Sequence, residues 1–234
     1  MIVAIHQPHF LPWAGYFNKL ANADCFILLD NVQYRKNYFQ NRTLIRHPTL
    51  AECKWLTVPV HAKLSTDHQD IAIADPNWRQ RALNKIHGAY RNAPYFDSYF
   101  GSIEQLFLEC ADLLVDVNFQ SLRFITKILD LSTTITRAST ITTAQEPNRL
   151  LALCRAVGAT GYITGEGWGE HNTEVFEVEG AGIRVHRQKF RASYQDFASD
   201  YYSGCFNLST LDLLFQLGPA ATSKIVQFPW RAKV

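Results

Sequence analysis

The chain has 234 residues, of which 47% are hydrophobic and 19% are charged, and its formal net charge is +2 at pH 7. A chain of this length and composition can bury a sizeable core, which excludes a globally disordered protein. The nearly balanced charge argues against a protein coated in basic charge for binding duplex nucleic acid, but it leaves room for a local anion site.

The sequence contains an odd number of cysteines, and they are widely spaced. They are Cys25, Cys53, Cys110, Cys154 and Cys205. Since there is no CxxC or CxxxC pair, the sequence offers neither a zinc ribbon nor a thioredoxin-type redox motif. We therefore expect the cysteines to be small buried side chains of a protein in a reducing cytoplasm.

Neither a signal peptide nor a membrane span is expected. The first apolar run, residues 2–5, is followed at once by His6, Gln7 and Pro8. No window approaches the roughly 18 apolar residues that a membrane-spanning helix needs. We expect a cytoplasmic protein.

The first thirty residues predict a strand, a loop, a helix and a second strand. Residues 2–5 and 25–29 are continuous apolar runs, which is the pattern of strands buried on both faces of a parallel sheet. Residues 6–13 form a loop interrupted by two prolines, and residues 15–22 predict the helix. This βαβ order indicates a parallel sheet.

The rest of the chain continues the α/β pattern around a helical middle. Pro76 follows Asp75 at a first-turn position, which is a helix-start signal. The further predicted strands are residues 56–60, 161–165 and 183–188. The further predicted helices are residues 76–91, 102–114, 121–129, 147–157 and 209–217. We predict a single α/β domain over residues 1–234, with a parallel-sheet, Rossmann-like core and a helical insertion at residues 76–131.

The loop after the first strand is the first candidate site. Ligands of open parallel sheets bind beyond the carboxyl ends of the strands, where this loop lies. Its prolines fix the backbone, and two imidazoles beside a helix N-terminus suit a phosphate or carboxylate group. The alternative is that the prolines and aromatic residues only plug the end of the sheet. The candidate site residues are His6, Gln7, His9, Trp13 and Tyr16.

A second polar block, residues 30–42, follows the second strand. Parallel strands carry both blocks to the same edge of the sheet. Asp30 can accept a hydrogen bond from a hydroxyl or ammonium group, while Lys36 and Arg42 can neutralise a phosphate. The alternative is a solvated basic turn with surface aromatic residues. The candidate binding residues are Gln33, Tyr34, Lys36, Asn41 and Arg42.

Two C-terminal features carry further candidates. Gly165, Glu166 and Trp168 follow a predicted strand, and they could bind a sugar by hydrogen bonding and stacking, or form a plain glycine turn. Ser209 and Asp212 have the spacing of a capping box with Asp in place of Glu or Gln, which favours a helix cap over catalysis.

The sequence has no GxSxG elbow and no HExxH pair, so we predict neither nucleophilic nor metal-dependent hydrolysis.

The N-terminal string HQPxFLPWxGYFxKLxxAD and the following string FxxLDxVQYxKxxFQNR resemble the signature of WbqC-like proteins, which are found in O-antigen and related polysaccharide gene clusters. Residues 159–167 and 207–215 are similar to later blocks of the same family. The resemblance covers nearly the whole chain. It implies an aminoacyl (glycine) or acyl transferase, or an ATP-dependent amide ligase, acting on a nucleotide-linked amino sugar in surface-polysaccharide biosynthesis. An aminoacyl-tRNA is a candidate donor and ATP a candidate cofactor.

Under this hypothesis His6 and His9 contact phosphates and stabilise charge during transfer, and Asp30 or Glu166 orients or deprotonates the amine. Two alternatives stay open. The element order also looks like that of nucleotidylyltransferases, although their His-x-Gly-His loop is replaced by His-Gln-Pro-His here. The chain could also be a non-catalytic nucleotide- or RNA-binding module, with aromatic residues beside Arg35 that stack on bases.

Overall fold

The computed structural model describes residues 1–48, 52–62, 65–109, 111–143, 147–165, 172–190, 205 and 207–229. At its centre lies a five-stranded sheet in which every strand pairing is parallel, with the order β7-β2-β1-β8-β9. The predicted α/β class with a parallel sheet is therefore confirmed. The strands are β1 (Ile2–His6), β2 (Cys25–Leu28), β7 (Thr134–Arg137), β8 (Gly161–Thr164) and β9 (Arg184–Arg187).

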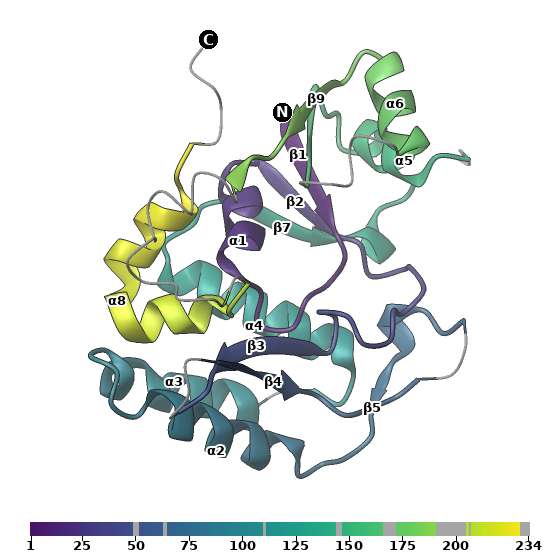
Figure 1. The fold of residues 1–234 in the computed structure, drawn as a ribbon. Helices are drawn as coiled ribbons and strands as arrows, with labels where there is room; N and C mark the ends of the chain where they lie inside the picture. The colour runs from purple at the N-terminus through teal and green to yellow at the C-terminus, as the bar shows by residue number, and fades with distance from the viewer. Residues whose placement is uncertain are drawn as a thin grey trace.

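Helices cover both faces of this sheet (Figure 1). Side chains alternate between two cores: Ala4 and Phe26 join one, and Val3, Ile5 and Ile27 join the other. The first core also holds α1 (Ala14–Ala21) and the long helix α8 (Thr210–Val226), and the second is closed by α5 (Arg149–Ala156) and α6 (Thr173–Gly180). Burial on both faces explains why the central strands read as continuous apolar runs.

The direction in which the sheet grows reverses beside β1. The chain passes from β1 to β2 and then to β7 on one side, and it then crosses to β8 and β9 on the other side. The loops leaving β1 and β8 therefore diverge at their carboxyl ends. In open parallel sheets this divergence opens a crevice where ligands bind.

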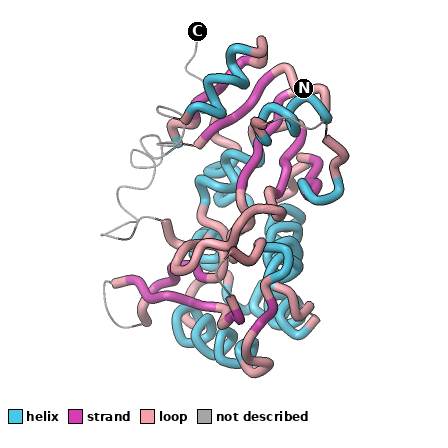
Figure 2. The backbone as a smooth tube through the Cα atoms, turned by 90° about the vertical axis from the view of Figure 1, so that its right-hand side faces the viewer, coloured by secondary structure: helices cyan, strands magenta, loops and turns pink. Residues whose placement is uncertain are grey.

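The crossover from β2 to β7 contains more than helices. Its elements are β3 (Arg42–Arg46), β4 (Cys53–Thr57), β5 (Val60–His61), β6 (Ala72–Ile73), α2 (Trp78–Tyr90), α3 (Phe96–Leu108) and α4 (Leu114–Ile128). Strands β3 and β4 form an antiparallel hairpin, as do the short β5 and β6. Figure 2 shows the β3–β4 hairpin beside the helices in the lower half of the molecule.

Several predicted boundaries are wrong. The predicted strand at residues 56–60 is divided, because β4 ends at Thr57 and β5 begins at Val60. Helices α3 and α4 begin six and seven residues before the predicted starts at 102 and 121, respectively. Their N-cap residues, Tyr95 and Leu113, make no side-chain cap hydrogen bond, so no capping signal marks either start.

Among the described residues, four strands and α-helices were not predicted, and one helix continues past its predicted end. The unpredicted elements are β3, β6, β7 and α6. Gly218, which directly follows the predicted end of the last helix at residue 217, has φ of 76° and introduces a kink, after which α8 continues to Val226. A Cβ at this position would lie 2.6 Å from the ring of Tyr95, so the kink and the close approach both require glycine.

The expectation that all cysteines are free is wrong for one pair. Cys53 and Cys205 form a disulfide although 152 residues separate them along the chain. The pairing follows from tertiary structure, because Leu44 of the neighbouring strand forms a β-bridge with Leu208. Cys25 and Cys154 are free and buried, as expected, and Cys110 lies outside the described residues. Within the described residues, no helix is long and apolar enough to cross a membrane.

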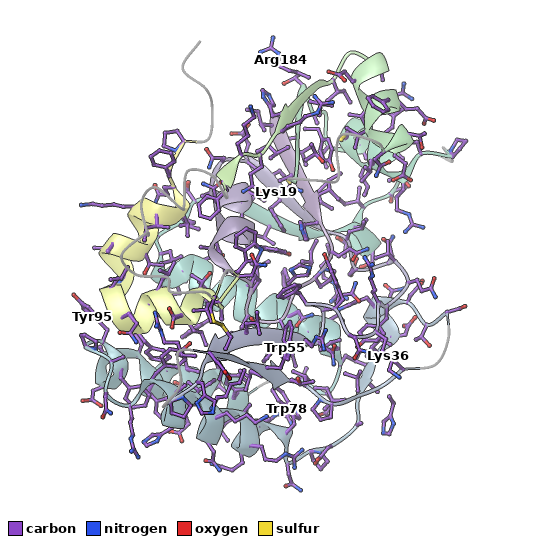
Figure 3. All side chains as sticks on the ribbon, viewed as in Figure 1. Lys19, Lys36, Trp55, Trp78, Tyr95 and Arg184 are labelled. Carbon is purple, nitrogen blue, oxygen red and sulfur yellow. A yellow bond between two sulfur atoms is a disulfide. The ribbon has the colours of Figure 1, made fainter. Side chains whose placement is uncertain are left out.

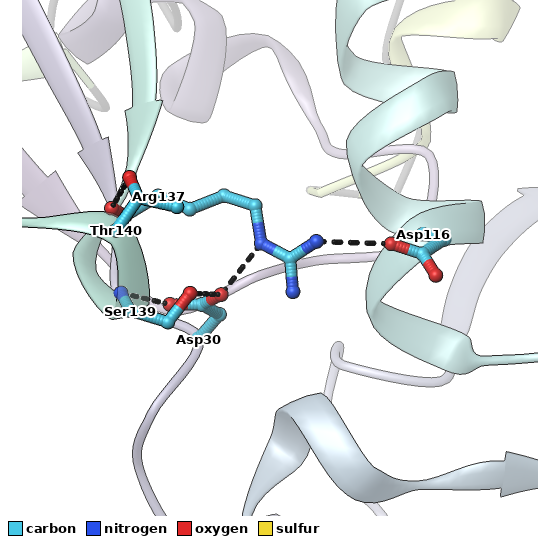
Figure 4. Close-up of polar contacts among 5 residues, drawn as sticks. All are labelled: Asp30, Asp116, Arg137, Ser139 and Thr140. Atoms are coloured by element: carbon cyan, nitrogen blue, oxygen red, sulfur yellow. Dashed lines mark hydrogen bonds and ion pairs between the residues drawn. The ribbon is translucent and has the colours of Figure 1, made fainter.

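A buried carboxylate joins the sheet to the inserted helices (Figure 4). Asp30, which follows β2 and is fully buried, accepts hydrogen bonds from the Arg137 Nε at 2.7 Å and from the Ser139 N–H and hydroxyl at 2.8 and 2.6 Å. Arg137 also donates to Asp116 of α4 at 3.0 Å. Burial alone would raise the pKa of Asp30, but the bonds from Ser139 and Arg137 outweigh burial and hold the pKa below its usual value.

We predict that Asp30→Asn lowers the free energy of unfolding by about 2–4 kcal/mol at pH 7, because it removes the charge that compensates Arg137. Since folding lowers the pKa of Asp30, its contribution is present above the unfolded-state pKa and is lost as the pH falls through the folded-state value. Urea titrations at pH 7 and in acid measure both effects. Asp112→Asn is the control, because the Asp112 side chain is exposed in its pair with Arg79 and should change stability by less than about 0.5 kcal/mol.

Candidate functional site

A cavity of about 310 Å³ lies beyond the carboxyl ends of β1 and β8, at the crevice where the strand order reverses. Two imidazoles, one ammonium and one guanidinium face it, and no Asp or Glu is among its described lining residues. The remaining wall is largely aromatic. The lining side chains used below are His6, Gln7, His9, Trp13, Tyr16, Lys19, Arg35, Tyr38, Tyr162, Thr164, Gln188 and Phe190.

His6 and His9 lie edge to face, with ring centroids 4.7 Å apart, and both rings contact Tyr16. The Nδ1 of His6 is 3.0 Å from the carbonyl oxygen of Gln7, whereas both ring nitrogens of His9 are buried without a hydrogen-bond partner among the described residues. An unpartnered buried ring nitrogen is costly, and it indicates a group that a ligand or water satisfies.

Both imidazoles are held neutral. Burial, reinforced by the positive charge of Lys19, lowers the pKa of His6 to about 3. Burial also lowers the pKa of His9 well below its usual value, with added repulsion from His6, His68 and Lys19. At neutral pH the two histidines therefore offer hydrogen bonds from fixed positions, and the positive charge comes from other residues.

Hydrogen bonds from outside the five-stranded sheet hold the loop that carries the histidines. The carbonyl of Leu11, a residue with φ of 42°, accepts hydrogen bonds from the hydroxyls of Thr43 on β3 and Ser209 before α8. The carbonyl of Pro12 accepts from both the N–H and the hydroxyl of Thr210. Segments from distant parts of the chain therefore fix one loop conformation that local sequence alone does not secure.

A second hydrogen-bond network, formed by residues of the crossover between β2 and β7, holds Gln7 in place. The amide of Gln40 donates to the side-chain oxygen of Gln7 at 3.1 Å, and Gln40 itself receives hydrogen bonds from the backbone N–H of Arg35 and from another amide. That amide belongs to Asn118 of α4, which donates to the Gln40 carbonyl at 2.8 Å and lies 3.2 Å from the ring of His68. Buried networks of this kind orient side chains strictly, because each lost bond leaves a buried polar group.

Lys19 lines the cavity, although it is not among the predicted site residues. Its side chain is almost fully buried on α1, lines the cavity and donates one hydrogen bond of 2.8 Å to the carbonyl of Ile5. Its Nζ also lies 5.9 Å from the centre of the Tyr162 ring. No carboxylate of a described residue lies within ion-pair distance of this ammonium group. In Figure 3, Lys19 lies in the middle of the molecule, whereas Lys36 lies towards its edge.

Burial lowers the pKa of Lys19 to about 7, so the amine is divided between its charged and neutral forms at physiological pH. The sequence does carry a signal for it. Lys19 stands between Phe17 and Leu20 on a helix of which only the last residue is not buried. A lysine on the buried side of such a helix is unusual unless it has a partner or a function.

Another part of the cavity wall is formed by α1 and by the residues that follow β9. The amide of Gln188, which is buried just after β9, donates to the carbonyl of Gly15 and to the side chain of Asn18, both at 2.8 Å. A Cβ on Gly15 would come within 2.2 Å of the indole of Trp13, so glycine is what allows this ring to lie against the helix. Trp13 in turn packs edge-on against Phe190.

Six predicted site residues line the cavity, and six described ones do not. Those that line it are His6, Gln7, His9, Trp13, Tyr16 and Gly165. Those that do not are Asp30, Gln33, Tyr34, Lys36, Asn41 and Arg42. Glu166 and Trp168 lie outside the described residues.

Part of the second polar block holds the structure around the cavity. Arg42 stacks on Trp55 at 4.0 Å, and its guanidinium donates to the carbonyl of Asn37. The amide of Asn41 donates to the carbonyl of Val58 at 2.9 Å. From this block Arg35, Tyr38 and Phe39 line the cavity, and the exposed Arg35 at its rim stacks 4.8 Å above the ring of Tyr38.

Ser209 is the N-cap of α8, since its hydroxyl accepts from the N–H of Leu211 at 3.3 Å. The reciprocal half of a capping box is absent, because the N–H of Ser209 donates to Leu44 and Asp212 pairs with Arg46 at 2.7 Å. Both residues therefore have structural partners.

Among the described residues, no group of three or more His, Cys, Asp or Glu side chains has the arrangement of a metal site.

The fold and the cavity define an α/β protein with a basic, aromatic pocket at the reversal point of a five-stranded parallel sheet. The chain belongs to the WbqC-like protein family, whose model matches residues 7–224, as the two N-terminal strings indicated. Uncharacterized protein Rv1507c of Mycobacterium tuberculosis (strain ATCC 25618 / H37Rv) is 30% identical over 225 residues, covering 94% of this chain and 95% of that protein. No solved structure gives a significant match.

The burial of Lys19 predicts a pH-dependent stability effect. Folding lowers its pKa from 10.5 to about 7, so the unfolded chain binds more protons between these values and the stability of the native protein rises with pH across this window. In Lys19→Met this rise is absent. We expect the stability of the variant relative to the native protein to be greatest at pH 6 and to shrink by about 4 kcal/mol towards pH 10.

Urea titrations of both proteins at pH 6, 8 and 10 measure this difference. Lys85→Met, at an exposed position of α2, is the matched control, and its difference from the native protein should vary far less with pH, because this side chain is not buried. A difference for Lys19→Met that stays constant over the same range would contradict the lowered pKa.

Proposed function

We propose that this protein is an aminoacyl (glycine) or acyl transferase, or an ATP-dependent amide ligase, that acts on a nucleotide-linked amino sugar in surface-polysaccharide biosynthesis. The observation that carries the proposal is the character of the cavity. It combines two imidazoles, Lys19 and Arg35 with an aromatic wall, and it has no acidic side chain among its described lining residues. Such a lining favours an anionic ligand with a ring that stacks.

The position and size of the cavity agree with a small-molecule substrate. Its volume of about 310 Å³ is at the lower end of the range of ligand pockets, which suits a sugar or one part of a nucleotide sugar. Parallel α/β sheets hold nucleotide ligands at this crevice in many proteins, and this supports a Rossmann-like mode of binding.

We assign distinct roles to the pocket residues. The neutral imidazoles of His6 and His9 hydrogen-bond to substrate oxygen atoms, and such bonds are strong in a dry site and need no reorganisation during transfer. Arg35 at the rim binds a phosphate group. Glu166, which follows the lining residue Gly165 in sequence, is the proposed base for the acceptor amine. Asp30 is already held by Arg137 and Ser139, so we assign it no chemical role.

The first test is a thermal-shift screen with ATP, nucleotide-linked amino sugars, and charged and uncharged tRNA, since a ligand of the folded state raises Tm by mass action. Ligands that bind are then incubated with glycine and ATP, or with glycyl-tRNA. Mass spectrometry follows the gain of one glycyl group on the sugar. Release of pyrophosphate with transfer of the nucleotide itself would instead identify a nucleotidylyltransferase, and binding without any product would identify a binding module.

We predict that His9→Gln and His6→Gln each lower kcat/KM by about 100-fold, because each removes a positioned hydrogen bond in a dry site. The measurement is the rate of glycyl transfer, with circular dichroism to verify folding. His61→Gln is the matched control, because His61 is exposed and does not line the cavity. Unchanged turnover in both pocket variants would show that the assigned site is wrong.

A further inference from the structure

The amine of Lys19 occupies an unusual place in the cavity. It is buried against the carbonyl end of β1, where among the described residues it makes a single hydrogen bond, to Ile5, with the face of the Tyr162 ring beside it. Removing an ammonium group from water is expensive, and proteins normally offset that cost with a carboxylate. No described carboxylate does so here, although the Nζ borders an open cavity.

We infer that Lys19 is the receptor for a substrate oxyanion on the floor of the cavity, and that the oxyanion binds together with a proton taken up by this amine. The inference rests on the proposed function only in placing the substrate in this cavity. It adds the chemical class of the group that lies deepest, a carboxylate or a phosphate oxygen, and the proton that accompanies it.

The ionisable groups around Lys19 indicate that the proton is taken up by Lys19 and not by one of them. They are His6, His9, Tyr16 and Tyr162, with Arg35 at the rim. The two histidines are too weakly basic to take up a proton near neutrality, and burial raises the pKa of both tyrosines, so they stay neutral. Lys19 alone among these groups changes charge near pH 7.

Binding an oxyanion next to the amine stabilises its charged form and so raises the pKa of Lys19. At pH 6 the free protein already carries this proton, and binding takes up about 0.1 proton for each ligand. At pH 8 the free amine is mostly neutral, and uptake rises to about 0.9 proton. Affinity therefore falls about tenfold for each pH unit above 7.

The test uses acetate as the carboxylate and dimethyl phosphate as the phosphate, because both keep a constant charge from about pH 6 to 9. Calorimetric titrations in two buffers of different ionisation enthalpy give the affinity and the number of protons taken up. The expected result is a pH-dependent affinity with proton uptake for at least one of the two probes, and the probe that binds identifies the source of the oxyanion.

Two variants assign the effect to Lys19. Lys19→Met should lose binding at least tenfold at pH 6, and Lys19→Arg, whose charge is permanent, should bind without proton uptake at any of these pH values. Lys85→Met should behave as the native protein does. If Lys19→Met does not fold, the native pH profile and Lys19→Arg still decide the question.

Binding that does not depend on pH, binding that Lys19→Met retains, or no binding of either probe at pH 6 would each overturn the inference. None of these results bears on whether nucleotide sugars bind or glycyl transfer occurs. Proton-coupled binding of a probe in a protein that transfers no acyl group would uphold the oxyanion site and reject the proposed function.

Discussion

The parallel pairing of β1 on both of its edges is the constraint on which the rest of this structure depends. Val3 lies opposite Cys25 on one side and opposite Tyr162 on the other, so the first strand of the chain is also the middle of the sheet. Helices must then cover both faces, and the chain must return to β1 from each direction. As a result, two diverging loops leave a crevice at the end of β1, and the cavity lies there.

Segments outside the five-stranded sheet hold the residues that form the crevice. The hydroxyls of Thr43 and Ser209 hold the loop after β1, and Asn118 holds Gln40 behind it. The inserted region is tied to the sheet through Asp30 and Arg137. The large crossover between β2 and β7 therefore acts as a support for the pocket, and Asp30, Gln40 and Asn41 of the second polar block are buried in that support.

Burying a charged group in the pocket lowers the stability of the folded protein and favours the binding of a ligand. Lys19 lowers the stability of the folded protein near neutral pH because its amine is desolvated without a carboxylate of a described residue nearby. Burial also keeps His6 and His9 uncharged, and the nearby ammonium group of Lys19 adds to this effect. Sites that bind and transform ligands commonly hold groups in such unfavourable states, since a ligand can relieve them.

The sequence by itself determined the α/β class, the family and the N-terminal loop as part of the pocket, because continuous apolar runs and a dense motif are local features. It did not reveal β7, the Cys53–Cys205 disulfide or the true starts of α3 and α4, which rest on contacts between distant segments or lack a capping signal. Only the tertiary structure decided that Lys19 and Arg35 supply the charge of the pocket, while Lys36 and Arg42 lie outside it. The physical reason is that apolar neighbours along the helix can indicate that a lysine is buried, but only the packing of α1 in the folded chain decides whether its amine meets other side chains or a cavity.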